Sequence, residues 1–264
     1  MPELPEVETA RRLARRVLTG HRIVAVATVD DPIVYAGVSP RRLAAALRGR
    51  RVEAVGRKGK HFWLELDRRP WPAFHFGMSG SLRVYGDASE RPRYWKLELQ
   101  SEDGARLAIR DPRRLGRIRL LRDPAREPPI SRLGFDVLEE MPGPRQLHGL
   151  LSRRRGPIKA VLLDQGLFAG VGNWIADEAL YQARISPHRP AASLKPAEVA
   201  RLRRRLAAIV VLAVRVLAAE KDLPRGWLFH RRWSDSRPQG RRAERIVRET
   251  IGGRTAAWVP SRQR

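Results

Sequence analysis

The residues that follow the initiator methionine are of the types that covalent chemistry at a sugar carbon requires. Pro2 comes directly after Met1, so removal of the methionine would leave a secondary amine as the chain terminus. An α-amino group titrates at about pH 8, so part of it is nucleophilic at neutral pH. Such amines attack sugar aldehydes or aminals and form iminium intermediates, and Glu3 is close enough to transfer protons. The same residues also fit an ordinary helix start, with proline in the first turn and an acid near the positive end of the dipole.

The charge of the chain indicates a polyanionic partner. The formal net charge is +25 on 264 residues. Contacts with phosphates release condensed counterions, so an excess of this size favours nucleic-acid binding. A general bias towards arginine could explain which basic residue is used, but not the excess of 53 basic residues over 28 acidic ones.

The composition restricts the class of protein further. A hydrophobic content of 42% supports a packed core, and the chain has no cysteine. Neither a disulfide nor a thiolate metal site is therefore possible. We find no run of 18 apolar residues and no signal sequence, so we expect a soluble, cytoplasmic protein without a membrane partner.

The first half of the chain predicts a helix followed by short strands. Apolar residues recur at helical spacing between residues 3 and 18. Beyond residue 21, alternating runs separated by Gly, Pro or Asp clusters indicate an antiparallel β-sandwich, interrupted by a short helix at residues 40–47. The expected strands are Arg22–Thr28, Val52–Gly56, Phe62–Leu66, Leu82–Tyr85, Lys96–Leu99, Leu107–Ile109 and Arg117–Leu121.

The second half of the chain is expected to be mainly helical. Several prolines between residues 123 and 145 mark a boundary. Helical patterns then cover Gln146–Ser152, Pro157–Asp164, Asn173–Ala183 and Pro196–Ala219, and the arginine-rich tail alternates as a β-hairpin does. The predicted organisation is an N-terminal β-sandwich domain (1–122), a linker (123–145), a helical domain (146–225) and a hairpin (226–264).

Short motifs occur in a characteristic order over nearly the whole chain. They are Pro2–Thr9, Lys58–His61, His75–Leu82, Asp111–Gly116, Ile158–Lys159, Gly170–Asn173 and Gly253–Arg254. In this order they resemble the formamidopyrimidine-DNA glycosylase and endonuclease VIII family. The resemblance implies an α+β fold, with an N-terminal antiparallel β-sandwich flanked by helices. A helix–two-turn–helix domain with a β-hairpin finger would follow, and the protein would bind damaged double-stranded DNA as a monomer.

The resemblance also gives the N-terminus a role. It implies that the Pro2 amine attacks C1′ of a damaged nucleotide and expels the base, after which β-elimination, and commonly δ-elimination, cuts the strand. Glu3 would shuttle protons, and Glu6 would support the site rather than react. Arg254, in the finger, is assigned to minor-groove and phosphate contacts in the catalytic complex.

Further residues are implied to hold the DNA backbone beside the lesion. Lys60 would contact a phosphate and assist elimination; alone it could be a solvated lysine at a strand end, with Lys58 as a competitor. Asn173 would grip a phosphate with help from Lys159, because the Gly-rich loop before it allows close backbone approach at a helix N-terminus. By itself Asn173 could equally be a helix N-cap. His75 is likewise assigned to DNA binding.

Three residues match the family's set that fills the gap left by an everted base. Met78, Arg113 and Leu115 would occupy that gap and hold the orphaned partner base. The third position is usually phenylalanine, and a leucine stacks less well on bases, so the opposite-base preference stays open. Taken alone, Met78 could be a core residue in a β-turn.

The tail departs from the family's zinc finger. Val259 and Arg262 fall on two of the usual cysteine positions, and Ser236 and Gln239, less securely, on the other two. None of them forms a thiolate site. We therefore expect no metal and no organic cofactor.

The Gly253–Arg254 pair survives in this tail. It indicates a zincless finger, a β-hairpin of the same shape held by side-chain packing. Trp233 and Trp258 are candidate clamps for that hairpin.

The segment that would cover an everted base is short. Only Lys221–Arg231 connects the last helix to the finger, as in the endonuclease VIII branch, so recognition of 8-oxoguanine by a long loop is in doubt. Formamidopyrimidines, oxidised pyrimidines and hydantoins all remain open. The predicted protein is a bifunctional glycosylase and lyase associated with the bacterial nucleoid. The alternative is a catalytically silent damaged-DNA-binding protein of the same fold.

Overall fold

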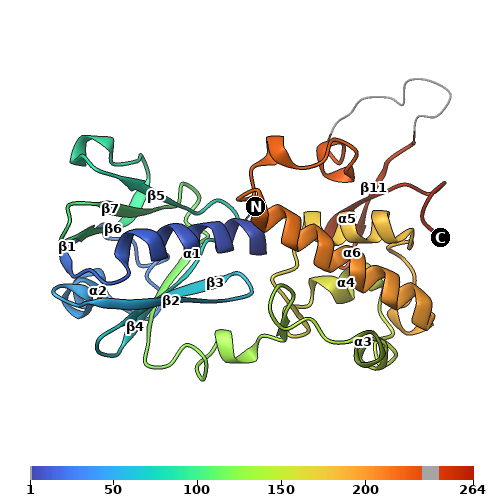
Figure 1. Cartoon of the computed structure of the whole chain (residues 1–264), viewed down its shortest axis with the longest axis horizontal. Coiled ribbons are helices and arrows are strands. Elements are labelled where there is room, and N and C mark those ends of the chain that lie inside the picture. Colours follow the sequence, from blue (N-terminus) through green and yellow to red (C-terminus); the bar gives the residue numbers. More distant parts are fainter. Residues whose placement is uncertain (1, 234–243) are drawn as a thin grey trace. The chain divides into compact units, whose positions relative to one another are not determined.

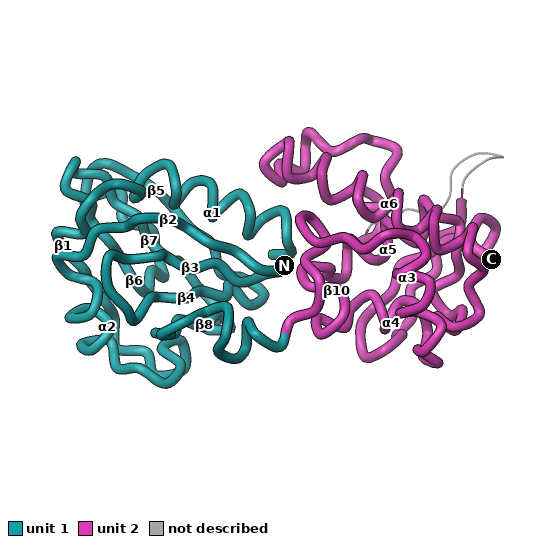
Figure 2. The backbone as a smooth tube through the Cα atoms, turned by 60° about the horizontal axis from the view of Figure 1, so that its bottom comes forward, with its two compact units in different colours: residues 1–132 teal, residues 133–264 magenta. Residues whose placement is uncertain are grey.

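The computed structural model describes residues 2–233 and 244–264 and divides the chain into two compact units. Unit 1 is Met1–Arg132 and unit 2 is Leu133–Arg264 (Figure 2). The division lies inside the predicted linker, the end of which belongs to unit 2. The predicted hairpin segment is also part of unit 2.

Unit 1 contains two four-stranded antiparallel sheets in its described part, residues 2–132 (Figure 1). The strand orders are β1-β6-β7-β5 and β2-β3-β4-β8. The helices are α1 (Leu4–Leu18) and α2 (Pro40–Leu47), with 3-10 turns at Ala88–Glu90 and Ile130–Arg132. The strands are β1 (Ile23–Thr28), β2 (Val52–Lys58), β3 (His61–Leu66), β4 (Trp71–His75), β5 (Ser81–Tyr85), β6 (Trp95–Ser101), β7 (Arg106–Arg110) and β8 (Arg117–Leu121). All the predicted strands are present, with one more.

The additional strand is β4, which the sequence pattern did not predict because it contains Pro72. A proline has no backbone N–H and normally interrupts the interior of a sheet. Here the pairing between β3 and β4 runs only from His75 to Ala73, while Pro72 is opposite Leu120 on β8. The missing N–H therefore leaves no gap in the β3–β4 ladder.

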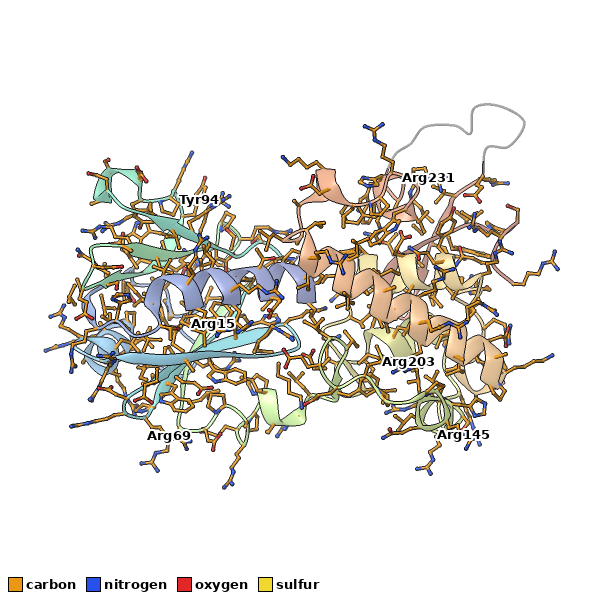
Figure 3. All side chains as sticks on the ribbon, viewed as in Figure 1. Arg15, Arg69, Tyr94, Arg145, Arg203 and Arg231 are labelled. Carbon is orange, nitrogen blue, oxygen red and sulfur yellow. The ribbon has the colours of Figure 1, made fainter. Side chains whose placement is uncertain are left out.

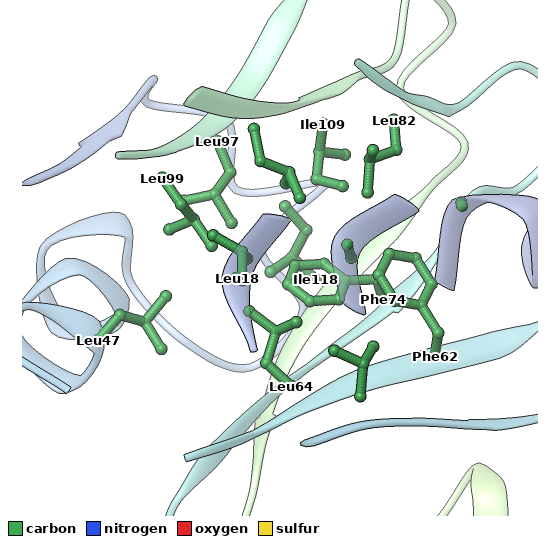
Figure 4. Packing of buried hydrophobic residues seen from close by; sticks show 14 of the residues in the cluster. Leu18, Leu47, Phe62, Leu64, Phe74, Leu82, Leu97, Leu99, Ile109 and Ile118 are labelled. Atoms are coloured by element: carbon green, nitrogen blue, oxygen red, sulfur yellow. The ribbon is translucent and has the colours of Figure 1, made fainter. Parts of the chain in front are cut away.

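The core of unit 1 lies between the sheets and is closed by α1. This helix packs against β2 and β3 of one sheet and against β5 of the other (Figure 1). Its apolar residues, among them Leu18, form one continuous cluster with side chains from both sheets (Figure 4). The sheet residues of this cluster include Phe62, Phe74, Leu97 and Ile118. Burial of this stripe positions the start of α1, where the candidate nucleophile lies.

A buried ionic cluster links α1 to β2. The Glu8 side chain, 2% exposed, accepts hydrogen bonds from Arg11 and Arg12 at 2.8 Å and from Arg57 Nε at 3.0 Å. Burial alone would raise the pKa of Glu8, but the hydrogen bonds from Arg11 and Arg12 and the charge of Arg57 lower it to about 2. Glu8 therefore stays ionised inside the unit.

Unit 2 combines helices with a β-hairpin. The helices are α3 (Pro144–Leu151), α4 (Ile158–Leu163), α5 (Asn173–Ala183) and α6 (Pro196–Arg215), with 3-10 turns at Ala191–Ser193, Glu220–Asp222 and Leu228–His230. The strands β9 (Phe135–Asp136) and β10 (Phe168–Ala169) pair in parallel, and β11 (Val247–Ile251) and β12 (Arg254–Trp258) form the hairpin. Helix α5 packs against α4, α6 and β12. The hairpin is thus docked on the helices.

Two local conformations set the ends of these elements. Leu217 and Ala218 have positive φ angles, which end α6 at Arg215 rather than at the predicted Ala219. Gly252 and Gly253, both with positive φ, form the two-residue turn between β11 and β12.

Over residues 2–233 and 244–264, no helix is long and apolar enough to cross a membrane.

We predict that Glu8→Gln lowers stability and flattens its dependence on pH. The folded-state pKa of Glu8 is about 2, below its ordinary value of 4.5. Its contribution is therefore complete above pH 4.5 and is lost as the pH falls towards 2, and it amounts to roughly 3 kcal/mol at neutral pH. Urea unfolding at several pH values between 2 and 7 measures the difference. The control is Glu53→Gln, an exposed glutamate of β2. Equal pH profiles for the two variants would contradict the prediction.

Candidate active site

The start of α1 holds the predicted nucleophile next to two carboxyl groups. Pro2 is half-buried and Glu3, the N-cap residue, is 1% exposed. Glu3 N donates to Glu6 Oε2 at 2.9 Å, and the Glu3 side chain accepts from the Glu6 backbone in a reciprocal capping box. The segment is therefore an ordinary helix start in its geometry, and that geometry fixes both acids beside Pro2.

Glu6 is poised to change its protonation state near neutral pH. Burial, followed by the nearby charge of Glu3, raises the pKa of Glu6 to about 7. A carboxyl group with such a pKa can hold or release a proton under physiological conditions. The two acids at the start of α1 can therefore share proton transfer.

Lys60 lies in the tight turn that joins β2 and β3. Lys58 ends β2 and pairs with His61, so Gly59 and Lys60 form the two-residue turn, with Gly59 at a φ of 56°. Arg57 Nη1 donates to the Gly59 carbonyl at 3.0 Å. Because Arg57 is also paired with Glu8, the ionic cluster of α1 holds the turn that carries Lys60. Sequence reasoning missed this link, although Glu8 lies within the first motif.

His75 is a neutral imidazole next to a second one. The rings of His75 and His61 lie 4.6 Å apart, centroid to centroid. Burial, together with neighbouring cations such as Lys60, lowers the pKa of His75 to about 4 and that of His61 to about 3. His75 Nδ1 accepts from Gly77 N at 3.2 Å, so the proton of the neutral ring is on Nε2. His75 can therefore offer a phosphate a neutral N–H donor.

The three predicted gap-filling residues lie on two loops of unit 1. Met78 is 40% and Leu115 38% exposed, and Arg113 is exposed as well, so Met78 is not a core residue. The loops touch so closely that a Cβ on Gly77 would lie 2.3 Å from the Leu115 carbonyl oxygen. The structure therefore brings the loops that carry these three residues into contact.

Asp111, which is 1% exposed, joins these loops. One of its oxygens accepts from Ser79 Oγ at 2.9 Å and the other from Gly116 N at 2.7 Å. Asp111 begins one of the motifs of the sequence, but the sequence analysis assigns this residue no role. Its position directly before a proline in a short polar loop was the available signal.

In unit 2, Asn173 and the finger arginine are neighbours. Gly172 is the N-cap of α5, so Asn173 is the first helical residue rather than the cap. Its Nδ2 donates to the Thr255 carbonyl at 2.9 Å, directly after the exposed Arg254 at the start of β12. Asn173 and Arg254, two of the residues predicted to bind DNA from unit 2, are thus brought together.

The structure buries Lys159 completely. Its ammonium donates to the Asn173 carbonyl at 3.0 Å and to Asp177. In this arrangement Lys159 supports the start of α5 from inside the unit. Burial of a lysine depends on a buried partner, and the four-residue spacing of Asn173 and Asp177 on one helix face was the available signal.

The residues at the usual zinc positions do not fit a metal. Val259 is fully buried in an apolar cluster with Tyr181 and Leu228. Arg262 donates to Glu244 at 3.0 Å, and its guanidinium carbon lies 4.5 Å from the centre of the Tyr181 ring. Over residues 2–233 and 244–264, no group of three His, Asp or Glu residues could hold a metal ion. Ser236 and Gln239 lie outside the described residues.

The two candidate tryptophan clamps differ. Trp258 packs edge-on against His188, with ring centres 5.4 Å apart, and its Nε1 donates to Glu249 at 2.5 Å across the hairpin. Trp233 is 62% exposed, and the Arg232 guanidinium lies over its ring. Trp258 is therefore the residue of the pair that helps to hold the hairpin.

Exposed arginines lie on both units. Figure 3 labels Arg15 and Arg69 on unit 1 and Arg145 on unit 2, and all three are exposed. Such side chains give each unit a surface that attracts phosphates. Pro2, Glu3, Lys60 and the gap-filling residues belong to unit 1, whereas Asn173, Lys159 and Arg254 belong to unit 2.

Comparison with known proteins gives matches along both units. The model of the formamidopyrimidine-DNA glycosylase N-terminal domain matches residues 1–118, and that of the formamidopyrimidine-DNA glycosylase H2TH domain matches residues 133–222. A formamidopyrimidine-DNA glycosylase of Arabidopsis thaliana is 39% identical over 277 residues, covering 100% of this chain and 71% of the relative. One from Chloroflexus aurantiacus is 40% identical over 208 residues, covering 75% and 71%.

Solved structures show the same fold. The Lactococcus lactis formamidopyrimidine-DNA glycosylase, non-covalently bound to DNA that contains an AP site, superimposes with a TM-score of 0.85 over 99% of both chains at 23% identity. The fold likeness and the sequence matches agree along the chain. With family models on both units and a 39% identical relative that spans its whole length, this chain belongs to the formamidopyrimidine-DNA glycosylase family.

Proposed function

We propose that this protein is a bifunctional DNA glycosylase and apurinic/apyrimidinic lyase of base-excision repair. The observation that carries the proposal is the start of α1, where Pro2 adjoins the buried Glu3 and the Glu6 carboxyl group. Curated relatives 39% and 40% identical carry the name formamidopyrimidine-DNA glycosylase, which supports the same activity here. The protein would act on duplex DNA at the nucleoid, as a monomer and without a metal or organic cofactor.

The reaction begins with displacement of the damaged base. Once Met1 has been removed, the Pro2 nitrogen bonds to C1′ as the glycosidic bond breaks, and the base leaves with a proton. The amine then loses its N–H proton, the C1′–O4′ bond breaks, and O4′ takes a proton from Glu3. The product is an iminium that joins Pro2 to the opened sugar. Glu6, with a pKa of about 7, can take up or return protons beside Glu3.

Strand cleavage follows from the same intermediate. The iminium withdraws electrons from C2′, which loses a proton, and the C3′–O bond breaks with the phosphate as leaving group. A second elimination breaks the C5′–O bond, and water then releases Pro2. Lys60 would hold a phosphate beside the lesion, as would His75 through its neutral Nε2–H group.

Base eversion must be balanced by filling the gap that it leaves. Met78, Arg113 and Leu115 are exposed on the two loops joined by Asp111, where an apolar wedge and a guanidinium fork can enter the duplex. Asn173 and Arg254 would hold the backbone from unit 2. The substrate class that we propose is ring-opened and oxidised bases in double-stranded DNA.

We predict that blocking the terminal amine abolishes covalent chemistry while DNA binding persists. Protein that retains Met1, or carries an N-terminal tag, should lose at least 100-fold in borohydride trapping, since removing a catalytic nucleophile costs several orders of magnitude. Affinity for a tetrahydrofuran duplex should change by less than about threefold, because the phosphate contacts remain. Trapping is measured on duplexes with 8-oxoguanine, dihydrouracil, 5-hydroxyuracil, formamidopyrimidine or an abasic site.

The matched control carries the same tag at its C-terminus and should be trapped as the untagged protein is. An N-terminally tagged enzyme that is trapped at full rate would contradict the assignment of Pro2 as the nucleophile. Untagged protein that binds every duplex but is never trapped would indicate the catalytically silent binder instead.

We predict that chelators leave the enzyme unchanged. The usual ligand positions hold the buried Val259 and the ion-paired Arg262, so removal of zinc has nothing to act on. Strand cleavage and the melting temperature are compared before and after dialysis against EDTA. Loss of cleavage that added zinc restores would overturn this prediction.

A further inference from the structure

One buried carboxylate joins three segments of unit 2. Asp177, on α5, is 2% exposed. One of its oxygens accepts from the Lys159 ammonium of α4, and the other accepts from the Arg232 guanidinium and from Ala257 N of β12 at 3.2 Å. Asp177 therefore connects α4, the segment after the last 3-10 turn, and the hairpin.

The charges around Asp177 make this connection sensitive to substitution. Lys159 is fully buried and Arg232 is 5% exposed, so two buried cations donate to this one carboxylate. A buried ion that loses its partner is strongly destabilising, because its lost hydration is no longer compensated. An asparagine at this position offers one acceptor oxygen and turns an N–H₂ group towards a cation. At least one of the three contacts must then break.

The hairpin meets α5 in register with the helix. Asn173 and Asp177 are four residues apart and face β12, where they bind the Thr255 carbonyl and the Ala257 amide. Four residues of helix and two residues of strand both span roughly 6 Å. The two hydrogen bonds therefore set the position of β12 along α5, and with it the exposed Arg254 at the start of the strand.

The turn before Arg254 also packs against the helices of unit 2. A Cβ on Gly252 would lie only 2.6 Å from the Ala160 Cβ of α4. Ala160 follows Lys159, whose ammonium holds the Asn173 carbonyl at 3.0 Å. The base of α4, the start of α5 and the finger turn thus form one packed assembly around Asp177.

We propose that Asp177 is a positioning residue that sets Arg254 against Asn173, so that both can hold the DNA backbone. The inference rests on the proposed function for its role in DNA binding, and on contacts within unit 2 for its structural part. In this chain the role of fixing the finger, which a metal fills in zinc-bearing fingers, falls to side chains. Asp177 anchors β12 through Ala257, and the cluster of Glu244 with Arg262 and Arg231 holds the chain just outside the two strands, at the end of the hairpin away from its turn.

The first arm of the test measures the hairpin without DNA. Amide hydrogen exchange is compared for wild-type protein, Asp177→Asn and the control Asp222→Asn, which removes the same charge from an exposed position of the same unit. We expect faster exchange by about tenfold or more at Ala257 and its hairpin neighbours in Asp177→Asn alone, because the segment loses a buried anchor. The strands of unit 1 should be unchanged. Unchanged exchange in the hairpin would overturn the inference.

The second arm measures affinity for a tetrahydrofuran duplex in a double-mutant cycle. Removing a negative charge would by itself tighten DNA binding, as is expected for Asp222→Asn. In Asp177→Asn, by contrast, Arg254 should be misplaced, and the affinity for the duplex should fall on the order of tenfold. A fall of that size corresponds to the loss of one charge-assisted hydrogen bond. Combined with Arg254→Ala, Asp177→Asn should add little, whereas combined with Lys60→Ala of unit 1 the two effects should add.

The arms separate the possible failures. Additive effects of Asp177→Asn and Arg254→Ala would overturn the positioning role. If wild-type protein fails to bind the duplex, the proposed function fails, and amide exchange still decides whether Asp177 fixes the hairpin. Should Asp177→Asn not fold, Arg232→Gln removes one of its partners and is expected to show the same pattern at smaller amplitude.

Discussion

Glu8 in unit 1 and Asp177 in unit 2 are each buried, and each accepts hydrogen bonds from cations on other segments of the chain. In a chain with 53 basic and 28 acidic residues, carboxylates are the scarce partner. Each buried carboxylate can order two or three cations at once, since its two oxygens offer about four acceptor positions. The position of these few acids therefore decides which cations are structural and which face the solvent.

This constraint places the two kinds of cation next to one another. Arg57 is bound to Glu8 and holds the turn of Lys60, while Lys159 is bound to Asp177 and holds the start of α5. A phosphate contact made by a long, flexible side chain loses conformational entropy, and a rigid backbone beneath it reduces that cost. In both units a buried cation thus holds the backbone that carries a partly exposed donor.

The sequence predicted most elements because their signals are local. The bounds of α2 and α5 agree with the prediction, and proline or a Gly-rich loop marks each start. Strand β4 was missed because a sheet can accept Pro72 only where the pairing between β3 and β4 has already ended. The sequence does not show where that pairing ends. The burial of Lys159 could not be predicted without the tertiary structure. A lysine is expected to be exposed unless an acidic partner, here Asp177, is known to lie beside it.

The finger shows why the loss of cysteines does not remove the element. A two-stranded hairpin is marginal on its own, so β11 and β12 need an external anchor. A metal supplies one by joining both ends of the finger at a point. Here Val259 is buried against Tyr181, Glu244 pairs with Arg262 beside them, and β12 itself is held through Ala257. Because each anchor uses residues of α5, the finger is stable only as part of the helical unit, which couples the position of Arg254 to that of Asn173.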